Sequence, residues 1–144
     1  MKKIFALFAV FCLCFSGCVS TDPQIDPELV VMEITEYFEG SVGFEIKNNS
    51  KDRISFGENY SLEFYNGKEW EEVGETSETF FIAIAHILES ENIYSSSANL
   101  EMRYGILSDG NYRIVKEIRF LNEDGEDYGG QEIFAEFEVS QKER

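Results

Sequence analysis

Tyr60-Ser61-Leu62-Glu63-Phe64-Tyr65-Asn66-Gly67 is the stretch that best predicts the fold of this chain. Its first, third and fifth residues are large and apolar or aromatic, and they alternate with residues of the opposite face. This is the pattern of a β-strand with one side against a core. Asn-Gly follows at once and is the strongest short signal for a β-hairpin. Trp70 and Val73 then fall on a returning strand, so the stretch predicts two antiparallel strands.

The same period of two recurs along the chain and predicts further strands. The clearest segments are Val30–Phe38, Val42–Ile46, Tyr112–Phe120 and Ile133–Val139. Gly40-Ser41 predicts a tight turn that joins the first two of them, and Asn92–Met102 predicts a weaker strand. Lys116 lies on the same parity as the apolar residues of its segment.

Phe80–Leu88 is almost wholly apolar, which fits a strand buried on both faces or a short core helix. Its repeated Ile and Phe favour the strand. No helical period is sustained anywhere, and no internal repeat is present. Seven or eight short strands separated by turn signals predict an all-β fold, an antiparallel β-sandwich.

The N-terminus has the pattern of a secretory signal peptide. Lys2 and Lys3 precede the uncharged segment Ile4–Phe15, and small residues follow at Ser16-Gly17. The apolar segment is about a dozen residues long, whereas a helix that spans a bilayer needs about 20. Two alternatives remain: an ordinary signal peptide cut elsewhere, and an uncleaved anchor.

Phe15-Ser16-Gly17-Cys18 resembles the lipobox of bacterial lipoproteins, in which the cysteine thiol receives a diacylglyceryl group before cleavage. Phe15 departs from the pattern, because that position usually holds Leu or another aliphatic residue. The resemblance implies that Cys18 is lipidated, and two or more acyl chains give stable anchoring. It therefore implies a lipid-anchored protein on the extracytoplasmic face of the cell membrane.

These features divide the chain into three parts. Residues 1–17 are the predicted signal peptide, 18–29 the lipidated cysteine with an extended tether, and 30–140 a single β domain. The tether contains both prolines and little apolar mass, as is typical of an extended linker. Cys12 and Cys14 leave with the signal. The mature domain then has no disulfide and depends on its hydrophobic core.

The charge of the chain is strongly acidic, with 28 acidic and 12 basic residues and a net charge of −16. Loss of Lys2 and Lys3 makes the mature charge −18. Nucleic acid is disfavoured as a partner because its phosphates require a basic surface. Anionic headgroups should also repel the domain, so we expect it to project away from the membrane. The simpler interpretation is that the acids keep an exported domain soluble.

Leu107-Ser108-Asp109-Gly110-Asn111-Tyr112 suits a tyrosine corner, in which the phenol hydroxyl bonds to backbone a few residues upstream. With other turn and core residues, this segment resembles a bacterial Ig-like domain family that is common in small lipoproteins of Gram-positive bacteria. The other residues are Asn48-Asn49-Ser50, Ile54-Ser55-Phe56-Gly57, Tyr60-Ser61-Leu62-Glu63, Trp70 and Tyr104-Gly105. The similarity covers roughly Val30 to Val139. It implies an immunoglobulin-like antiparallel β-sandwich and an envelope location, but no reaction.

The sequence departs from this family at Leu88-Glu89-Ser90-Glu91, where relatives usually place a Pro-Gly turn.

Residues for catalysis are scarce. His86 is the only histidine, which excludes a histidine-based metal cluster and leaves a single residue for any triad. We expect it to be a core or half-buried residue. Nucleophile and phosphate-binding motifs are absent, and the carboxylates fall mostly on solvent-facing parities or in loops. The sequence therefore predicts no catalytic residues and no cofactor, with a hydrolase built on an unrecognised carboxylate pair as a remote alternative.

The acidic loop 122–131 is the best candidate for an ion site. Its oxygen donors beside glycine are Asn122, Asp124, Glu126 and Asp127. The EF-hand pattern fails because Asp127 occupies the position of the turn glycine. A solvated hairpin loop is the simpler interpretation, and a calcium- or small-ligand-binding protein is the alternative function.

Aromatic residues are numerous enough that some should lie on the surface, where they would mark a protein or glycan contact. The candidates are Tyr37, Tyr65, Trp70, Tyr94, Tyr128 and Phe134. Core packing is the alternative for most of them. The sequence as a whole predicts a non-enzymatic binding or structural module of the cell envelope. Its expected partners are the membrane, through the lipid, and an envelope protein or glycan.

Overall fold

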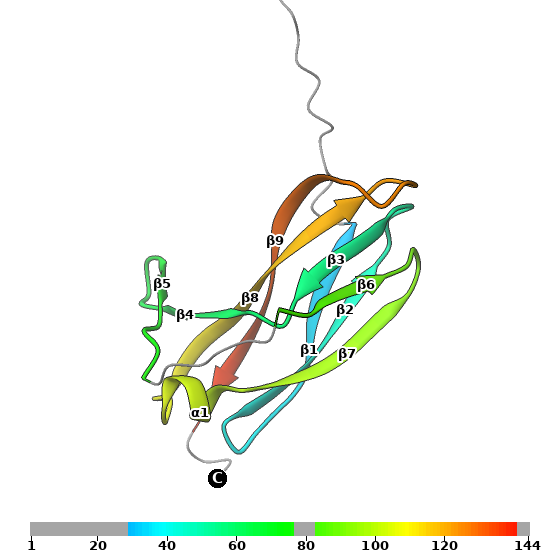
Figure 1. The fold of residues 1–144 in the computed structure, drawn as a ribbon. Coiled ribbons are helices and arrows are strands. Elements are labelled where there is room, and N and C mark those ends of the chain that lie inside the picture. The colour runs from blue at the N-terminus through cyan, green and yellow to red at the C-terminus, as the bar shows by residue number, and fades with distance from the viewer. Residues whose placement is uncertain (1–28, 77–82, 141–144) are drawn as a thin grey trace, which may run out of the picture.

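A computed structural model describes residues 29–76 and 83–140. Over these residues the chain forms two antiparallel sheets and one short helix (Figure 1). The elements are β1 (Val30–Phe38), β2 (Ser41–Asn48), β3 (Arg53–Gly57), β4 (Ser61–Tyr65), β5 (Trp70–Glu72), β6 (Ala85–Leu88), β7 (Ile93–Asn99), α1 (Leu100–Tyr104), β8 (Gly110–Leu121) and β9 (Asp127–Val139). The predicted all-β sandwich is confirmed. The described residues contain nine strands where seven or eight were expected, because the alternation did not single out β3.

The smaller sheet has the strand order β1-β2-β7. β1 and β2 form the predicted hairpin around Glu39-Gly40, whose φ angles are 48° and 75°. Two consecutive positive φ angles define a type I′ turn, whose twist suits a two-residue hairpin. The predicted turn at Gly40-Ser41 is one residue late, because Ser41 already pairs with Phe38.

β8 is the centre of the larger sheet. It pairs with β9 along one edge and with two different strands along the other. On that second edge β4 pairs with residues 112–115 and β3 with residues 118–121. Lys116 and Glu117 lie between these two ladders, at a break where the chain leaves β3 and enters β4. This break positions the cavities described below.

The core lies between the sheets and is formed by the parities that the alternation predicted. Tyr112, Ile114, Ile118 and Phe120 of β8 are each at most 3% exposed. Burial of each such side chain contributes about 1.5–3 kcal/mol. β1 and β9 close one side of the sandwich, where aromatic rings of the two strands stack with centroids 5.5 Å apart.

Tyr112 forms the predicted tyrosine corner. Its hydroxyl donates a hydrogen bond to the carbonyl oxygen of Ser108 at 3.0 Å. Its ring packs against Phe64 and Phe137, with centroids 5.1 Å and 5.9 Å away. The hydroxyl thus fixes the chain that crosses into β8 while the ring joins the core.

The prediction of a strand through Met102 is wrong, because β7 ends at Asn99 and α1 begins at Leu100. The side-chain carbonyl of Asn99 accepts a hydrogen bond from the Met102 backbone N–H at 2.9 Å and so caps the helix. Gly105 ends it with a φ of 76°. Among the described residues there is no helix of the length and hydropathy that a membrane span requires.

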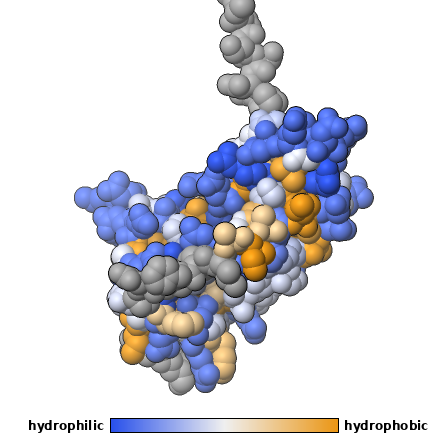
Figure 2. Space-filling model, viewed as in Figure 1, coloured by the Kyte–Doolittle hydropathy of each residue, from blue (hydrophilic) through white to orange (hydrophobic). Residues whose placement is uncertain are grey.

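The predicted strand Phe80–Leu88 lies partly outside the described residues. Its remainder contains β6, an edge strand that pairs with β3. Ile84 and Ile87 are 46% and 59% exposed, so burial on both faces is wrong here. Figure 2 shows hydrophobic atoms at the surface in the region of β6. The apolar run Phe80–Leu88 did not reveal that β6 lies at the edge of the larger sheet.

Candidate functional site

The outer face of the larger sheet carries aromatic residues around one arginine. The guanidinium carbon of Arg113 lies 4.7 Å from the ring centroid of Trp70 and 4.6 Å from that of Phe134. Its Nε donates a hydrogen bond to Glu63, its partner on β4. The ring of Tyr65 packs against Trp70 with centroids 5.2 Å apart. We call Tyr65, Trp70, Arg113 and Phe134 the aromatic strip.

The aromatic strip is accessible to a partner. Tyr65 and Phe134 are 37% and 48% exposed, and Trp70 is half-buried. Large aromatic side chains and arginine are the residue types that most often anchor protein interfaces. Of the six aromatic residues expected at the surface, Tyr128 is also exposed, whereas Tyr37 and Tyr94 are half-buried and pack against the core.

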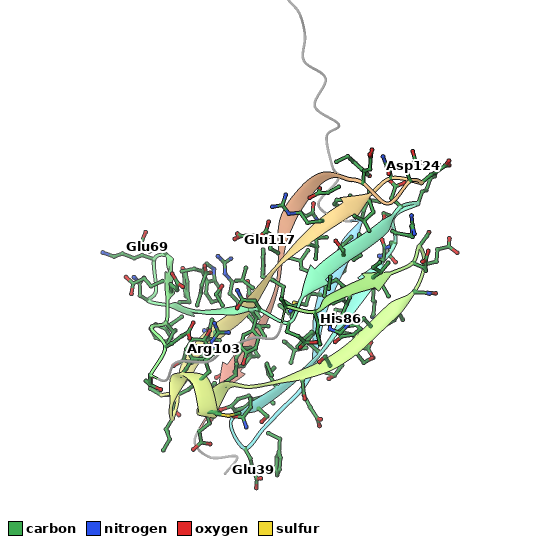
Figure 3. All side chains as sticks on the ribbon, in the orientation of Figure 1. Glu39, Glu69, His86, Arg103, Glu117 and Asp124 are labelled. Atoms are coloured by element: carbon green, nitrogen blue, oxygen red, sulfur yellow. The ribbon has the colours of Figure 1, made fainter. Side chains whose placement is uncertain are left out.

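A polar groove of about 500 Å³ adjoins the aromatic strip at the break in the sheet. Glu72, Glu117, Glu132 and Arg119 are among the residues that line it, and Val115 joins it to the strip by pairing with Phe134. Figure 3 shows Glu117 on the outer side of β8. The groove contains more carboxylates than cations, so its chemistry favours a basic group.

A second, smaller cavity lies on the inner side of the same break. It has a volume of about 190 Å³ and lies between β7 and the link that joins β3 to β4. Its walls include Phe44, Tyr60, Tyr94 and Ser96, and Lys116 lines it from β8. We call it the inner pocket.

Lys116 is one of three charged residues that line the inner pocket, with Glu58 and Arg103, and it is 4% exposed. Its Nζ donates hydrogen bonds to the carbonyl oxygens of Gly57 and Asn59, each at 2.9 Å. The rings of Phe44 and Phe56 flank it, with centroids 5.9 Å and 5.8 Å away. Burial lowers the pKa of Lys116 to about 8, and the negative charge of Glu58 only partly opposes this.

Arg103 of α1, labelled in Figure 3, is among the residues that line both the inner pocket and the outer groove. Its guanidinium donates to the Tyr60 carbonyl oxygen and to Glu75, each at 2.5 Å, and its carbon lies 4.7 Å from the Tyr60 ring centroid. Burial acts to lower the pKa of Arg103, but Glu75 and the neighbouring tyrosines outweigh it and raise the pKa. The arginine therefore remains a cation.

His86 of β6 is half-buried, as predicted. Its Nε2 contacts the carboxylate of Glu58 and lies 3.5 Å from the hydroxyl of Tyr94. Its ring stacks on Phe56 with centroids 5.6 Å apart. These contacts join β6 to β7 and to the link after β3, so they close the side of the sandwich.

The predicted ion-site residues form the turn between β8 and β9, which we call the acidic hairpin. The Asn122 side-chain oxygen accepts from the Glu126 backbone N–H at 2.8 Å, and Asp127 accepts from Gly129 and pairs with Arg119. These oxygens stabilise the turn itself. Asp124 lies at the tip (Figure 3). Over the described part of the chain, no three His, Cys, Asp or Glu side chains gather as a metal site would require.

Cys18 and the rest of the predicted signal and tether lie outside the described residues.

Two facing antiparallel sheets with a tyrosine corner define an immunoglobulin-like β-sandwich. The model of the bacterial Ig-like domain family matches residues 29–138. The chain therefore belongs to this family. The predicted resemblance is confirmed at the level of the domain.

Comparison with individual proteins adds little. No curated protein matches the chain. The archaellum periplasmic stator protein FlaG from Sulfolobus acidocaldarius is 14% identical with a TM-score of 0.37, over 77% of this chain and 100% of that chain. A chain of the archaellum periplasmic stator complex of FlaF and FlaG from the same organism is 13% identical, with a TM-score of 0.34. This likeness covers 92% of this chain and 100% of that chain. Likenesses at this level carry no argument about function.

Sequence reasoning missed the inner pocket. It named Tyr65, Trp70 and Phe134 as candidate surface aromatics, but it missed Arg113 and the gathering of these residues into one strip. The position of Lys116 on an apolar parity was the available signal for the pocket, because a buried lysine needs a polar environment. For the aromatic strip, the abundance of aromatic residues was a signal for surface exposure but not for their position beside Arg113. Trp70, Arg113 and Phe134 come from three strands, and the pairing register alone brings them together.

Proposed function

We propose that this protein is a lipid-anchored, extracytoplasmic binding module of the cell envelope, without enzymatic activity. The anchor is Cys18, the tether is residues 18–29, and the Ig-like domain makes the contact. The partner is an envelope protein or glycan that binds the outer face of the larger sheet. Membership in the bacterial Ig-like family supports this proposal, and so does the lipobox-like sequence that ends at Cys18.

The observation that carries the binding function is the aromatic strip. Arg113 is held between the rings of Trp70 and Phe134 and bonded to Glu63, so its position is fixed before a partner arrives. A preorganised contact loses less conformational entropy on binding. The adjoining acidic groove widens the contact and favours a partner with basic groups.

The charge distribution supports an arrangement in which the domain stands off the membrane. The acidic hairpin lies at the same end as the start of β1, because Asn49 N–H donates to the Leu29 carbonyl at 2.7 Å and Arg53 bonds to the Asn122 carbonyl at 3.2 Å. A tether of about 11 residues reaches at most about 36–40 Å. Repulsion from anionic headgroups extends it and leaves the outer face accessible.

The anchor is tested by the variant Cys18→Ala and metabolic labelling with a radioactive fatty acid. We expect the label to disappear and the protein to leave the membrane fraction. A variant that still incorporates the label contradicts lipidation at Cys18.

The binding face is tested by crosslinking in living cells with a photoreactive phenylalanine analogue. In one variant the photoreactive analogue replaces Phe134 on the outer face. In the control it replaces Phe38, which is 60% exposed on β1 of the other sheet. We expect a discrete adduct from position 134 that the further change Trp70→Ala removes. Equal adducts from both positions, or none from position 134, contradict the proposal.

A further inference from the structure

The inner pocket places a buried cation beside an empty volume. Lys116 is 4% exposed and lines the cavity together with aromatic side chains. A lysine ammonium has three N–H donors. Two of them are directed to the carbonyl oxygens of Gly57 and Asn59. Among the described residues no hydrogen-bond acceptor is found for the third, which leaves it for a molecule in the pocket.

The charge of Lys116 also lacks a direct counter-ion within the described part of the protein, whose ion pairs join other groups. The carboxylate that acts on the pKa of Lys116 is that of Glu58, which also lines the pocket and contacts His86. A second cation, Arg103, lines the same pocket. A buried cation is costly unless an anion accompanies it.

We propose that the inner pocket binds a small organic carboxylate, whose oxygens accept from Lys116 and whose apolar part packs against Phe44, Tyr60 and Tyr94. This site is separate from the outer face and does not depend on the proposed function. Ser96 and Tyr94, which carry hydroxyl groups, are also among the residues that line the pocket.

The size of the inner pocket restricts the ligand. Its volume of about 190 Å³ is below the roughly 300–1,000 Å³ of pockets for drug-sized ligands. This is about the volume that six water molecules occupy in liquid water. A carboxylate with one ring fits this limit. Met102, which is 67% exposed, lies at the rim, so the pocket reaches the surface.

Binding should depend on pH, because the carboxylate requires the ammonium form of Lys116. The other charged or titratable groups around it are Glu58, Tyr60, Tyr94 and Arg103. With a Lys116 pKa of about 8, affinity should fall about tenfold between pH 7 and pH 9. The pKa of Tyr60 is raised by burial, so its hydroxyl stays protonated over this range.

The test is a titration of the purified protein with benzoate, followed by NMR and calorimetry, with benzamide as the neutral isostere. We expect benzoate to bind at least about tenfold more tightly than benzamide at pH 7, as one charge-assisted hydrogen bond would give. The preference should vanish in Lys116→Met and persist in Lys51→Met, which removes an exposed lysine. Equal binding of the two compounds, or no binding of benzoate at millimolar concentration, overturns the proposal.

A second variant keeps the test valid if Lys116→Met fails to fold. Ser96→Leu fills the inner pocket from β7 and leaves Lys116 in place. We expect it to abolish benzoate binding while its circular dichroism remains that of the wild type. Undiminished binding in a folded Ser96→Leu variant overturns the assignment of the site to this pocket.

Discussion

Burial of Lys116 makes the stability of the domain depend on pH. The pKa of Lys116 falls from 10.5 to about 8 on folding, because burial penalises the charged form. Between these two values the unfolded chain binds more protons than the folded one, so stability rises with pH. One pKa unit corresponds to about 1.4 kcal/mol, and we therefore expect the free energy of unfolding to gain about 2–3 kcal/mol between pH 7 and pH 10.

Urea unfolding followed by the fluorescence of Trp70 measures this effect at several pH values. The variant Lys116→Met should lose the rise, and the exposed-site control Lys51→Met should keep it. The series ends at pH 10, because folding raises the pKa values of Tyr104 and Tyr128 from 10.0 to about 12. Above about pH 10 these tyrosines ionise first in the unfolded chain, so stability then falls as the pH rises. If wild type and Lys116→Met change in parallel over this range, the lysine is not buried as a cation and the reasoning fails.

Three further predictions concern the corner, one strained turn and the acidic hairpin. Tyr112→Phe removes the bond to Ser108 and should lower the free energy of unfolding by about 1–2 kcal/mol, whereas exposed Tyr65→Phe should change it by less than about 0.5 kcal/mol, both by urea unfolding. Glu91 has a φ of 60°, so Glu91→Gly should stabilise by up to about 1 kcal/mol. The control change Glu89→Gly, at a residue without a positive φ, should not stabilise the domain. A loss of stability in Glu91→Gly would refute the idea that the backbone at Glu91 is strained. Calcium at 10 mM should leave the melting temperature unchanged, since the hairpin oxygens already hold the turn, and a rise of several degrees would establish the ion site.

The local patterns of the sequence were enough to predict the layers, the core parities and the tyrosine corner. Each depends on residues near in sequence, such as the four-residue separation of Ser108 and Tyr112. α1 has its signals in Asn99 and Gly105, the residues that cap it, but one turn of helix is too short to show a period. Those signals lie inside a segment that also alternates as a strand.

The candidate sites depended on pairing that no local pattern contains. The inner pocket exists because β3 and β4 pair with different halves of β8 and leave Lys116 at the break. The exposure of Ile87 follows from the place of β6 at the sheet edge. Within Leu88–Glu91, Glu91 adopts a φ of 60°, a conformation that glycine adopts more readily than other residues.

Mass spectrometry of the N-terminal peptide of the protein extracted from membranes tests the central functional claim most directly. The account predicts that this peptide begins at Cys18 and carries the mass of at least a diacylglyceryl group. An unmodified Cys18, or a peptide that begins at another residue, would contradict it.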